Sequence, residues 1–519
     1  MNGRFLLAVL CALAACTASE TKRDSIPLAT QPDAGVAADK TAAAPPASAA
    51  SRAPAEQPGT AAPLMPDQQF RQGRPEPLQR ETKFEAPVPI ERKLKNGVRV
   101  LLMPNHSAPL VAVEVRILHG VDAVPIAKAG LAELVADAAI EGTRRRTADL
   151  VASDVEDIGA NLTSVAGNES TSVHLNVLRE RLPKGLDILG DVVSEPSFKP
   201  EDVERVRTLR LARLAQKQAS IGQLAADEAR RLVYGPKHPL GQPASGTPDT
   251  LRKVTRDDIV AYHKKFWVPG DAVIAVAGDV EPDEALNLLD LAFAKWQVRP
   301  APKLDVPRPQ PVRKRFISVV EKPSATQSQV WVVGPLFPAR DKDAVPLEIA
   351  NNVLGGVFTS RLNLNLREKH GYSYGVFSGL QLGRSFGAFF AQGGIVAKST
   401  APAAAEYQKE IAAFASGDMT EDELRRARDT YIRTLPSTLE TNDAVASAIA
   451  NLVVLGRPLD FYRTLPEKAR ALTREQVIAV VEKWIKPKEW PVVIVGPVGS
   501  ARGDLEKLGL GPVQTASSR

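Results

Sequence analysis

Cysteine and histidine are both scarce in this chain of 519 residues. The only two cysteines, Cys11 and Cys16, lie near the N-terminus, so the sequence after them can form no disulfide and its domains must be stabilised by their cores. Among the six histidines, no two are three to five positions apart, which is the spacing at which a helix presents a pair of zinc ligands. The sequence therefore excludes a disulfide scaffold and a helical two-histidine zinc site.

Long runs of one kind of residue are also missing. Lys and Arg number 66 against 60 Asp and Glu, a net charge of +6, and the basic residues form no long run. Because there is no RNA-binding motif of aromatic and basic residues either, we expect no nucleic-acid partner. Hydrophobic residues make up 44% of the chain and charged residues 24%, which is typical of soluble globular domains and not of a membrane bundle.

The N-terminus has the pattern of a bacterial export signal. Arg4 precedes an apolar run over 5–14, which is too short to span a bilayer but suits a secretory signal. The run ends Leu-Ala-Ala-Cys, which resembles a lipobox, so we predict a signal peptide over 1–15 and acylation of Cys16. An ordinary secretory signal cut nearby and an uncleaved anchor are the alternatives. Thr17 replaces the Asp that often retains lipoproteins at the inner membrane, so we expect a periplasm-facing outer-membrane lipoprotein or, alternatively, a soluble periplasmic protein.

The segment that follows is poor in residues that could build a core. Residues 16–86 are rich in Ala, Pro, Ser, Thr and Gln. Such a composition buries too little apolar surface to offset the entropy lost on ordering. We therefore predict a disordered tether that holds the structured part away from the membrane.

From residue 87 onward, strand and helix patterns alternate. An Asn96-Gly97 turn followed by apolar residues, and the alternation V-A-V-E-V-R-I-L over 111–118, predict two neighbouring strands. The pattern continues with helices over 129–140 and 148–158, strands over 161–165 and 172–178, three or four helices between 183 and 265, and a strand over 272–277. The mixture predicts an α+β fold with helices on one face of an antiparallel-rich sheet.

The second half of the chain repeats the first. A helical segment after Thr255 is echoed after Thr473, and the glycines that end the following strands, Gly278 and Gly496, are the same 218 positions apart. Tandem duplication is the simplest explanation. We predict two homologous α/β-roll domains that form one half of a clam shell, over 87–298 and 314–505. A proline-rich linker over 299–313 joins them, and a flexible tail over 506–519 follows.

One stretch of the second repeat, Ser360–Ser378, reads S-R-L-N-L-N-L-R-E-K-H-G-Y-S-Y-G-V-F-S. Ser360 suits a helix N-cap and Gly371 a helix stop, so we predict a short helix and then a strand of aromatic and β-branched residues. Arg367 would lie in the last helical turn and Tyr374 on the strand, so that two hydrogen-bond donors could converge on one oxygen. Taken alone, however, such an Arg commonly complements a helix dipole and such a Tyr commonly packs half-buried.

The motif S-R-L-x-x-x-L-R-E-K-x-G-x-x-Y resembles the Arg/Tyr motif of the pitrilysin, insulinase and mitochondrial-processing-peptidase superfamily, whose active members are inverted-motif zinc peptidases. In that family the Arg and Tyr bind the substrate carbonyl and its developing oxyanion. The resemblance covers about 87–501 and implies those roles for Arg367 and Tyr374, as well as a fold of repeated domains.

The same resemblance locates the zinc motif, and here the chain departs from the family. Active members carry G-L-A-H-x-x-E-H on the first helix of the first domain. The segment Ala129-Gly130-Leu131-Ala132 is present, but Glu133 replaces the first His, Ala136 the general-base Glu and Asp137 the second His. All three chemical positions are lost, so no metal is expected in this chain.

The third zinc ligand of the family, a Glu some seventy to eighty residues downstream, is missing as well. The segment 205–226 contains no acidic residue. Its cations could pair instead with Glu133 or Asp137; they are Arg207, Arg210, Arg213 and Lys217. A carboxylate site for calcium or magnesium at Glu133 and Asp137 is the alternative, although no further ligand is visible.

The resemblance implies a function in two parts. Some family members work as heterodimers in which one subunit bears zinc and the other supplies the Arg and Tyr. We therefore expect a subunit that is inactive alone and that hydrolyses unfolded periplasmic peptides only with a homologous zinc-bearing partner. The peptide is expected to add to a sheet edge at 159–165 or 385–396. The alternative is a noncatalytic peptide-binding scaffold or chaperone-like protein of the same fold.

Overall fold

The computed structural model describes residues 84–516. The predicted signal peptide, Cys16 and nearly all of the predicted tether lie outside the described residues. Over the range that is described, no helix is both long enough and apolar enough to cross a membrane.

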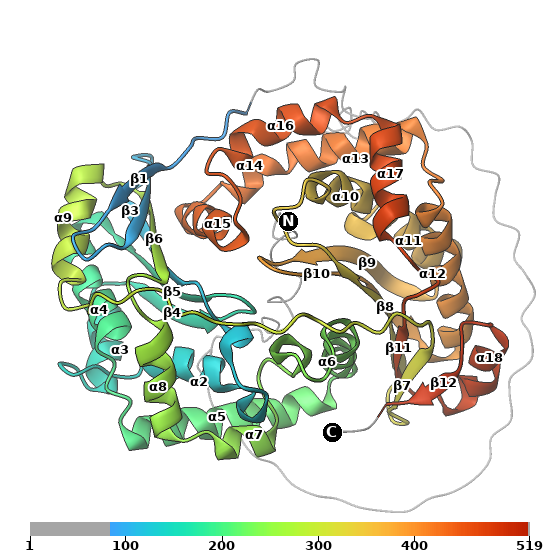
Figure 1. Cartoon of the computed structure of the whole chain (residues 1–519), viewed down its shortest axis with the longest axis horizontal. Coiled ribbons are helices and arrows are strands. Elements are labelled where there is room, and N and C mark those ends of the chain that lie inside the picture. The colour runs from blue at the N-terminus through green and yellow to red at the C-terminus, as the bar shows by residue number, and fades with distance from the viewer. Residues whose placement is uncertain (1–83, 517–519) are drawn as a thin grey trace, which may run out of the picture. The chain divides into compact units, whose positions relative to one another are not determined.

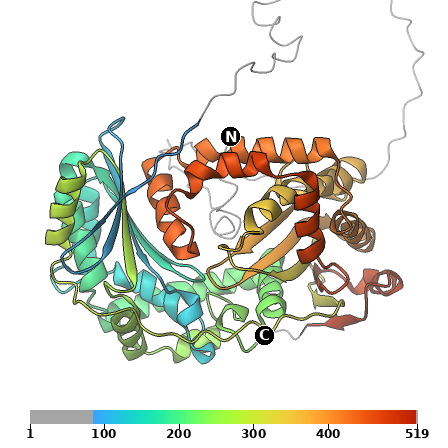
Figure 2. The same cartoon turned by 45° about the horizontal axis from the view of Figure 1, so that its top comes forward.

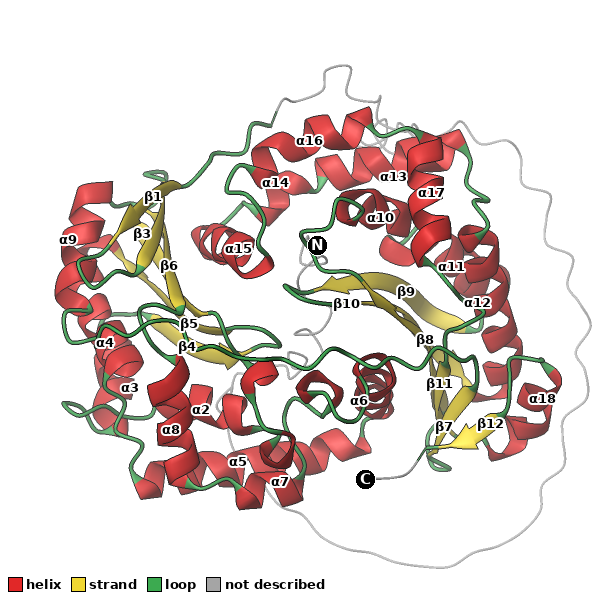
Figure 3. Ribbon diagram, in the orientation of Figure 1, coloured by secondary structure: helices red, strands yellow, loops and turns green. Residues whose placement is uncertain are grey.

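The first half of the described chain forms a six-stranded mixed sheet (Figures 1 and 3). Its strands are β1 (Ile90–Lys93), β2 (Arg99–Pro104), β3 (Leu110–Ile117), β4 (Asn161–Ala166), β5 (Thr171–Leu178) and β6 (Ala272–Gly278). They follow the order β1-β2-β6-β3-β5-β4, in which only β2 and β6 pair in parallel. The predicted Asn96-Gly97 turn joins β1 to β2, with Gly97 at a φ of 93° that favours glycine.

Helices of the same half cover one face of this sheet, except α6, which packs on the sheet of the other half. They are α2 (Leu131–Ala139), α3 (Ala148–Asp157), α4 (Leu182–Ser194), α5 (Pro200–Ala219), α6 (Ile221–Tyr234), α7 (Pro248–Lys253), α8 (Arg256–Phe266) and α9 (Pro282–Ala292), with the short 3-10 helix η2 (Val121–Ala123) before α2. Five helices, not three or four, lie in the segment predicted to be helical, because the six residues of α7 form a short helix capped by Thr247.

The second half forms another six-stranded sheet, in the order β12-β7-β11-β8-β10-β9. Its strands are β7 (Ile317–Glu321), β8 (Gln327–Leu336), β9 (Ser373–Leu382), β10 (Gly387–Val396), β11 (Val492–Gly496) and β12 (Val513–Thr515). Its helices are α10 (Ala344–Asn351), α11 (Arg361–Asn363), α12 (Thr400–Ala415), α13 (Glu421–Arg433), α14 (Leu435–Thr438), α15 (Asn442–Leu455), α16 (Phe461–Ala471), α17 (Arg474–Trp484) and α18 (Arg502–Lys507), with π-helical turns η6 (Asn352–Gly356) and η7 (Leu364–Lys369).

The two sheets confirm the predicted mixed α+β fold, and their strand orders repeat. β2-β6-β3-β5-β4 in the first sheet corresponds to β7-β11-β8-β10-β9 in the second. The echoed segments open α8 and α17, where Thr255 and Thr473 each form a capping box. The outermost strands differ, because β1 runs antiparallel to its neighbour and β12 runs parallel. We expected a flexible tail over 506–519, but residues 513–515 form β12, which pairs with β7.

Each half contributes a helix to the other half's sheet. Helix α15 of the second half packs on β3 and β6, and helix α6 of the first half packs on β8 and β11, as Figures 1 and 2 show. Val445, Ala446 and Ile449 of α15 form one apolar cluster with Val273 and Ala275 of β6. The alternate residues of β6 face the helices of their own half. Strand β6 is therefore buried along its whole length, which explains its unbroken apolar sequence.

A candidate substrate-contact site and a substituted zinc motif

The Arg/Tyr motif forms the helix and strand that its sequence predicts. Leu362 and Leu366 are fully buried and fix one face of the helical segment formed by α11 and η7. The helix ends at Lys369, and Gly371 adopts a φ of 63° that lets the chain turn into β9. The N–H of Tyr372 donates to the carbonyl of Leu366 at 2.8 Å and closes the turn.

A buried asparagine holds the helix against the strand. The Asn363 side chain is 1% exposed, accepts the backbone N–H of Val376 in β9 at 2.9 Å and donates to the carbonyl of Phe358 at 3.0 Å. Both polar groups of this amide are thus satisfied inside the protein. The element that carries Arg367 is therefore fixed to the strand that carries Tyr374.

Arg367 is partly exposed and has no strong ion pair. Its guanidinium lies over the ring of Phe358, 4.4 Å from the ring centroid, and its side chain is 35% exposed. Within residues 84–516, the one carboxylate in ion-pair range is that of the adjacent Glu368, at 3.4 Å from Nε. Such an exposed contact contributes little, whereas the aromatic ring orients the planar group. The N–H donors of Arg367 remain available to a ligand.

Tyr374 lies on a β-bulge and points into solvent. The register of β9 and β10 shifts between Gly393 and Ile395, which leaves Tyr374 and Gly375 opposite a single residue. The Ser373 hydroxyl holds this bulge by donating to the carbonyl of Gly394 at 2.7 Å and accepting the N–H of Gly375 at 3.0 Å. The Tyr374 side chain is 86% exposed, which rules out the interpretation that it packs half-buried in the core.

The two sequence-predicted residues therefore stand on either side of one rigid turn. No hydrogen bond joins Arg367 to Tyr374 in the part of the chain that the structure describes, so neither donor is used up by the other. A guanidinium and a phenol are both hydrogen-bond donors, and donors of this kind can stabilise negative charge on a carbonyl oxygen. Neither group is a usual zinc ligand, so the pair by itself offers no means of activating a water.

The substituted zinc motif lies on α2, and its two carboxylates bind an arginine of α5. Arg210 binds the Asp137 carboxylate at both oxygens, with Nε 2.6 Å from Oδ2 and Nη2 2.8 Å from Oδ1, and its Nη1 donates to Glu133. The three side chains are between 14% and 22% exposed. Burial opposes the charge of Arg210, but the two carboxylates outweigh it and raise the pKa of the guanidinium. Ala136 is completely buried.

The residues of this motif do not fit a zinc ion. Arg210 stands 77 positions after Glu133, in the downstream region where the family carries its third zinc ligand. A fixed positive charge there repels a metal cation, and it engages both carboxylates that could have bound one. No group of three or more His, Cys, Asp or Glu is placed to hold a metal ion anywhere in residues 84–516. The same contacts argue against a calcium or magnesium site at Glu133 and Asp137.

Of the four cations that could have paired with the motif, Arg210 is the one that binds both acids. Arg213 reaches only to 3.8 Å from Asp137. Arg207 donates to the carbonyls of Leu251 and Val254 instead. Lys217 donates to the Ser245 hydroxyl at 3.0 Å.

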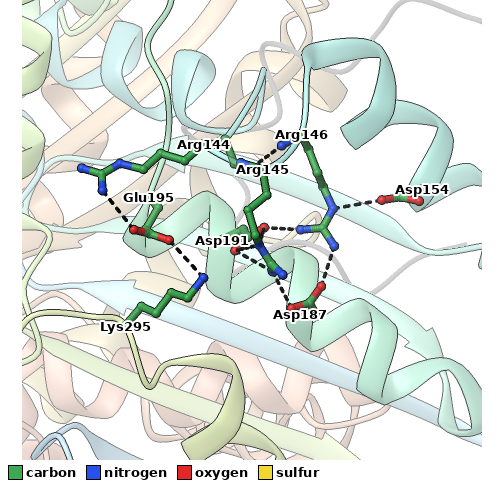
Figure 4. A network of polar contacts seen from close by, with 9 residues as sticks. Arg144, Arg145, Arg146, Asp154, Asp187, Asp191, Glu195 and Lys295 are labelled. Atoms are coloured by element: carbon green, nitrogen blue, oxygen red, sulfur yellow. Dashed lines mark hydrogen bonds and ion pairs between the residues drawn. The ribbon is translucent and has the colours of Figure 1, made fainter.

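The segment after α2 ends in three arginines that have a structural role (Figure 4). Arg145 binds both oxygens of Asp191 in α4, at 3.0 and 2.8 Å from Nε. Arg146 bonds to Asp191 as well, to Asp187 at 2.5 Å and to Asp154 of α3 at 2.9 Å. These contacts hold the connection between α2 and α3 against α4.

The expected peptide-docking segment 385–396 needs a correction. Most of it is β10, which lies between β8 and β9 and has hydrogen-bonding partners on both sides. The edge strands of the second sheet are β9 and β12, and those of the first sheet are β1 and β4. Strand β4 begins within the other expected segment. Only an edge strand offers unpaired backbone groups to a peptide.

Two residues that shape the site were not anticipated from the sequence. Asn363 and Ser373 make the buried hydrogen bonds that join helix to strand and hold the bulge. The only available signal was their small polar character inside an apolar motif, because such side chains often bond to nearby backbone.

Comparison with known proteins identifies the same family on both halves of the chain. Residues 99–244 match the model of insulinase (peptidase family M16), and residues 253–431 match the model of the peptidase M16 inactive domain.

Individual relatives span most of the described chain. It is 26% identical to an uncharacterized zinc protease of Mycobacterium leprae over 72% of this chain and 84% of that protein. It is also 26% identical to the non-peptidase homolog YmxG of Helicobacter pylori over 73% of this chain and 87% of that protein.

A solved structure shares the fold. The crystal structure of a peptidase M16 inactive domain from Pseudomonas fluorescens superposes with a TM-score of 0.74 at 23% identity, covering 79% of this chain and 98% of that chain. Together with the two matching family models, the Arg/Tyr motif and the substituted zinc motif show that the chain belongs to the peptidase M16 (insulinase) family.

Proposed function

We propose that this protein is the metal-free subunit of a two-chain M16 peptidase. In this proposal a homologous subunit bears zinc and activates the attacking water, while Arg367 and Tyr374 bind the substrate carbonyl and its oxyanion in trans. The substrates are unfolded peptides in the cell envelope, to which the protein is anchored through lipidated Cys16.

The observation that carries the proposal is the contrast between the two halves. On the first, Arg210 fills the substituted zinc motif with an internal cation. On the second, Tyr374 is 86% exposed on a bulge, and Arg367 stacks on Phe358 without a strong ion pair. A bulge that directs a tyrosine side chain into solvent does not stabilise the fold. Because β-bulges often direct side chains at functional sites, we take this one as support for a role in binding. The match of residues 253–431 to an inactive-domain model agrees with a second half that binds no metal itself.

The test is peptide hydrolysis with fluorogenic peptides by this protein, by a zinc-motif M16 homologue from the same genome, and by their mixture. We expect activity in the mixture alone. Arg367→Ala and Tyr374→Phe should each lower its kcat by about 10²- to 10³-fold if each supplies one oxyanion donor. Tyr372→Phe, two positions away, is the matched control and should leave kcat unchanged. Size-exclusion chromatography of each mixture checks that the variants still assemble.

A noncatalytic peptide-binding scaffold is the second candidate. The substituted zinc motif favours it, as does the name non-peptidase homolog given to the Helicobacter pylori relative. The scaffold function would be established if no mixture hydrolyses the peptides and this chain alone binds unfolded peptides. Zinc-dependent hydrolysis by this chain alone would overturn both proposals.

A further inference from the structure

The turns of two duplication-related hairpins meet between the halves of the chain. One turn joins β4 to β5, and the other joins β9 to β10. The Glu169 carboxylate, in the first turn, accepts the backbone N–H of Arg384 and the N–H of Ser385, the latter at 3.2 Å. The Arg384 side chain in turn lies 3.2 Å from the carboxylate of Asp122 in η2. We call Asp122, Glu169 and Arg384 the tip junction.

The first half holds its side of this junction in place. Asp122 is 4% exposed, accepts the N–H of Gly120 at 2.8 Å and donates its own N–H to the carbonyl of Asn168 at 2.8 Å. Arg230 of α6 donates to the side chain of Asn168 at 3.0 Å. The Asp122 carboxylate is therefore held by contacts within the first half and does not depend on Arg384 for its position.

The β9–β10 turn of the second half packs closely against these first-half residues. A Cβ atom on Gly383 would lie too close to the Glu169 carboxylate and to the Phe386 carbonyl, so a larger residue there would displace Glu169. Phe386, at the end of the same turn, packs edge-on against His238 with ring centroids 5.8 Å apart. Charge, backbone hydrogen bonds and an aromatic contact thus hold a turn of only four residues.

The same turn has the sequence spacing of a serine-hydrolase motif but not its structure. Gly383–Gly387 reads G-R-S-F-G, which matches G-x-S-x-G. The motif requires a strand that turns into a helix, whereas this segment joins two antiparallel strands. Gly383 therefore permits the close approach of Glu169, and Gly387 that of the Phe337 carbonyl; the segment does not present a nucleophile.

The topology connects this junction to the candidate site. Strand β9 carries Tyr374 near its beginning and enters the turn at its end. It is an edge strand, so on one side no other strand of residues 84–516 pairs with it. Edge strand β4 enters the other turn of the junction in the same way. Contacts at the turns are thus the place where the first half bonds to the hairpin that carries Tyr374.

We infer that the tip junction is a positioning device for strand β9. By binding Arg384 and the adjacent backbone, Asp122 and Glu169 of the first half set where Tyr374 stands relative to that half. Arg384 and Glu169 are positioning residues that act through β9 without touching substrate. The catalytic part of this inference rests on the proposed function, but the structural part does not.

The structural part is tested by hydrogen–deuterium exchange on the full chain, with mass spectrometry of peptides that cover 373–382. In Arg384→Ala and in Glu169→Ala we expect these amides to exchange about tenfold faster, because each variant removes a charged hydrogen-bonding partner. Arg384→Lys keeps the positive charge and should restore most of the protection. Arg502→Ala, an exposed arginine of the same half, is the matched control and should change nothing. Unchanged exchange of β9 in both alanine variants would overturn the inference.

The catalytic part is tested in the active mixture with the zinc-bearing subunit. Arg384→Ala should lower kcat and leave KM nearly unchanged, because a displaced Tyr374 weakens a contact made in the transition state. Faster exchange with an unchanged kcat would refute the positioning role. If no mixture is active, the proposed function fails, and the exchange experiment alone decides whether the junction holds β9.

Discussion

Replacing Arg210 with methionine tests whether an internal cation stabilises the substituted zinc motif. The variant leaves Glu133 and Asp137, 14% and 22% exposed, close together on one helix face without their cation. Breaking one side of a buried ion pair costs about 3–5 kcal/mol, and the partial exposure of these carboxylates puts the expected loss near the lower end, about 3 kcal/mol. Methionine keeps much of the arginine's apolar stem, so little of this loss comes from packing.

The assay is urea unfolding followed by far-ultraviolet circular dichroism, with and without a chelator. Adding Glu133→Gln and Asp137→Asn to Arg210→Met should recover most of the lost stability, since no unpaired charge then remains. Arg213→Met is the matched control; its side chain is 66% exposed and 3.8 Å from Asp137, so its effect should stay below about 0.5 kcal/mol. A loss under about 1 kcal/mol for Arg210→Met, or no recovery in the triple variant, would refute the reasoning. A chelator should change none of these curves.

Three further predictions concern other parts of the molecule. Ser373→Ala should lower the kcat of the active mixture and leave circular dichroism unchanged, because the bulge loses the hydroxyl that directs Tyr374; an unaltered kcat would contradict this. Burial alone would lower the pKa of His174, but its bonds with Asp443 and Glu114 raise the pKa from 6.5 to about 9. The stability that the protonated His174 contributes should be complete below pH 6.5 and lost as the pH rises through about 9. The unfolding free energies of wild type and His174→Gln should therefore converge above that pH. A difference between them that does not change with pH would argue against the ion pairs. Metabolic labelling with a fatty-acid analogue should mark the wild-type protein and not Cys16→Ala, and equal labelling of both would exclude lipidation at that residue.

Local patterns predicted much of the fold because they report on local physics. The segments after Thr255 and Thr473 share one helical pattern, and each helix begins in a capping box, which needs only four consecutive residues. Ser360 and Gly371 indicated the start and the stop of the motif helix, which runs from Arg361 to Lys369. Arg210 was one of the four cations expected to pair with the two carboxylates of α2. The expectation was simple, because the cations follow one another on one helix and the carboxylates had lost the zinc ion as a partner.

What the sequence did not reveal depends on partners distant along the chain. The bulge at Tyr374 depends on the register with β10, which the sequence of β9 alone does not determine. The edge position of β9 depends on the strand order of the whole sheet. The bonds of Glu169 to Arg384 and Ser385 span 215 and 216 positions. Contacts of this range follow from topology and not from periodicity.

The exchange of α6 and α15 means that a boundary drawn from the repeat is not a boundary for folding. If the chain is cut in the linker and each fragment is produced alone, the fragment with β6 lacks the helix that covers Val273 and Ala275, and the other lacks the cover of β8. Each fragment would expose an apolar sheet face to solvent and would aggregate unless the other fragment bound to it. The two halves therefore form one folding unit, although the sequence repeats in two.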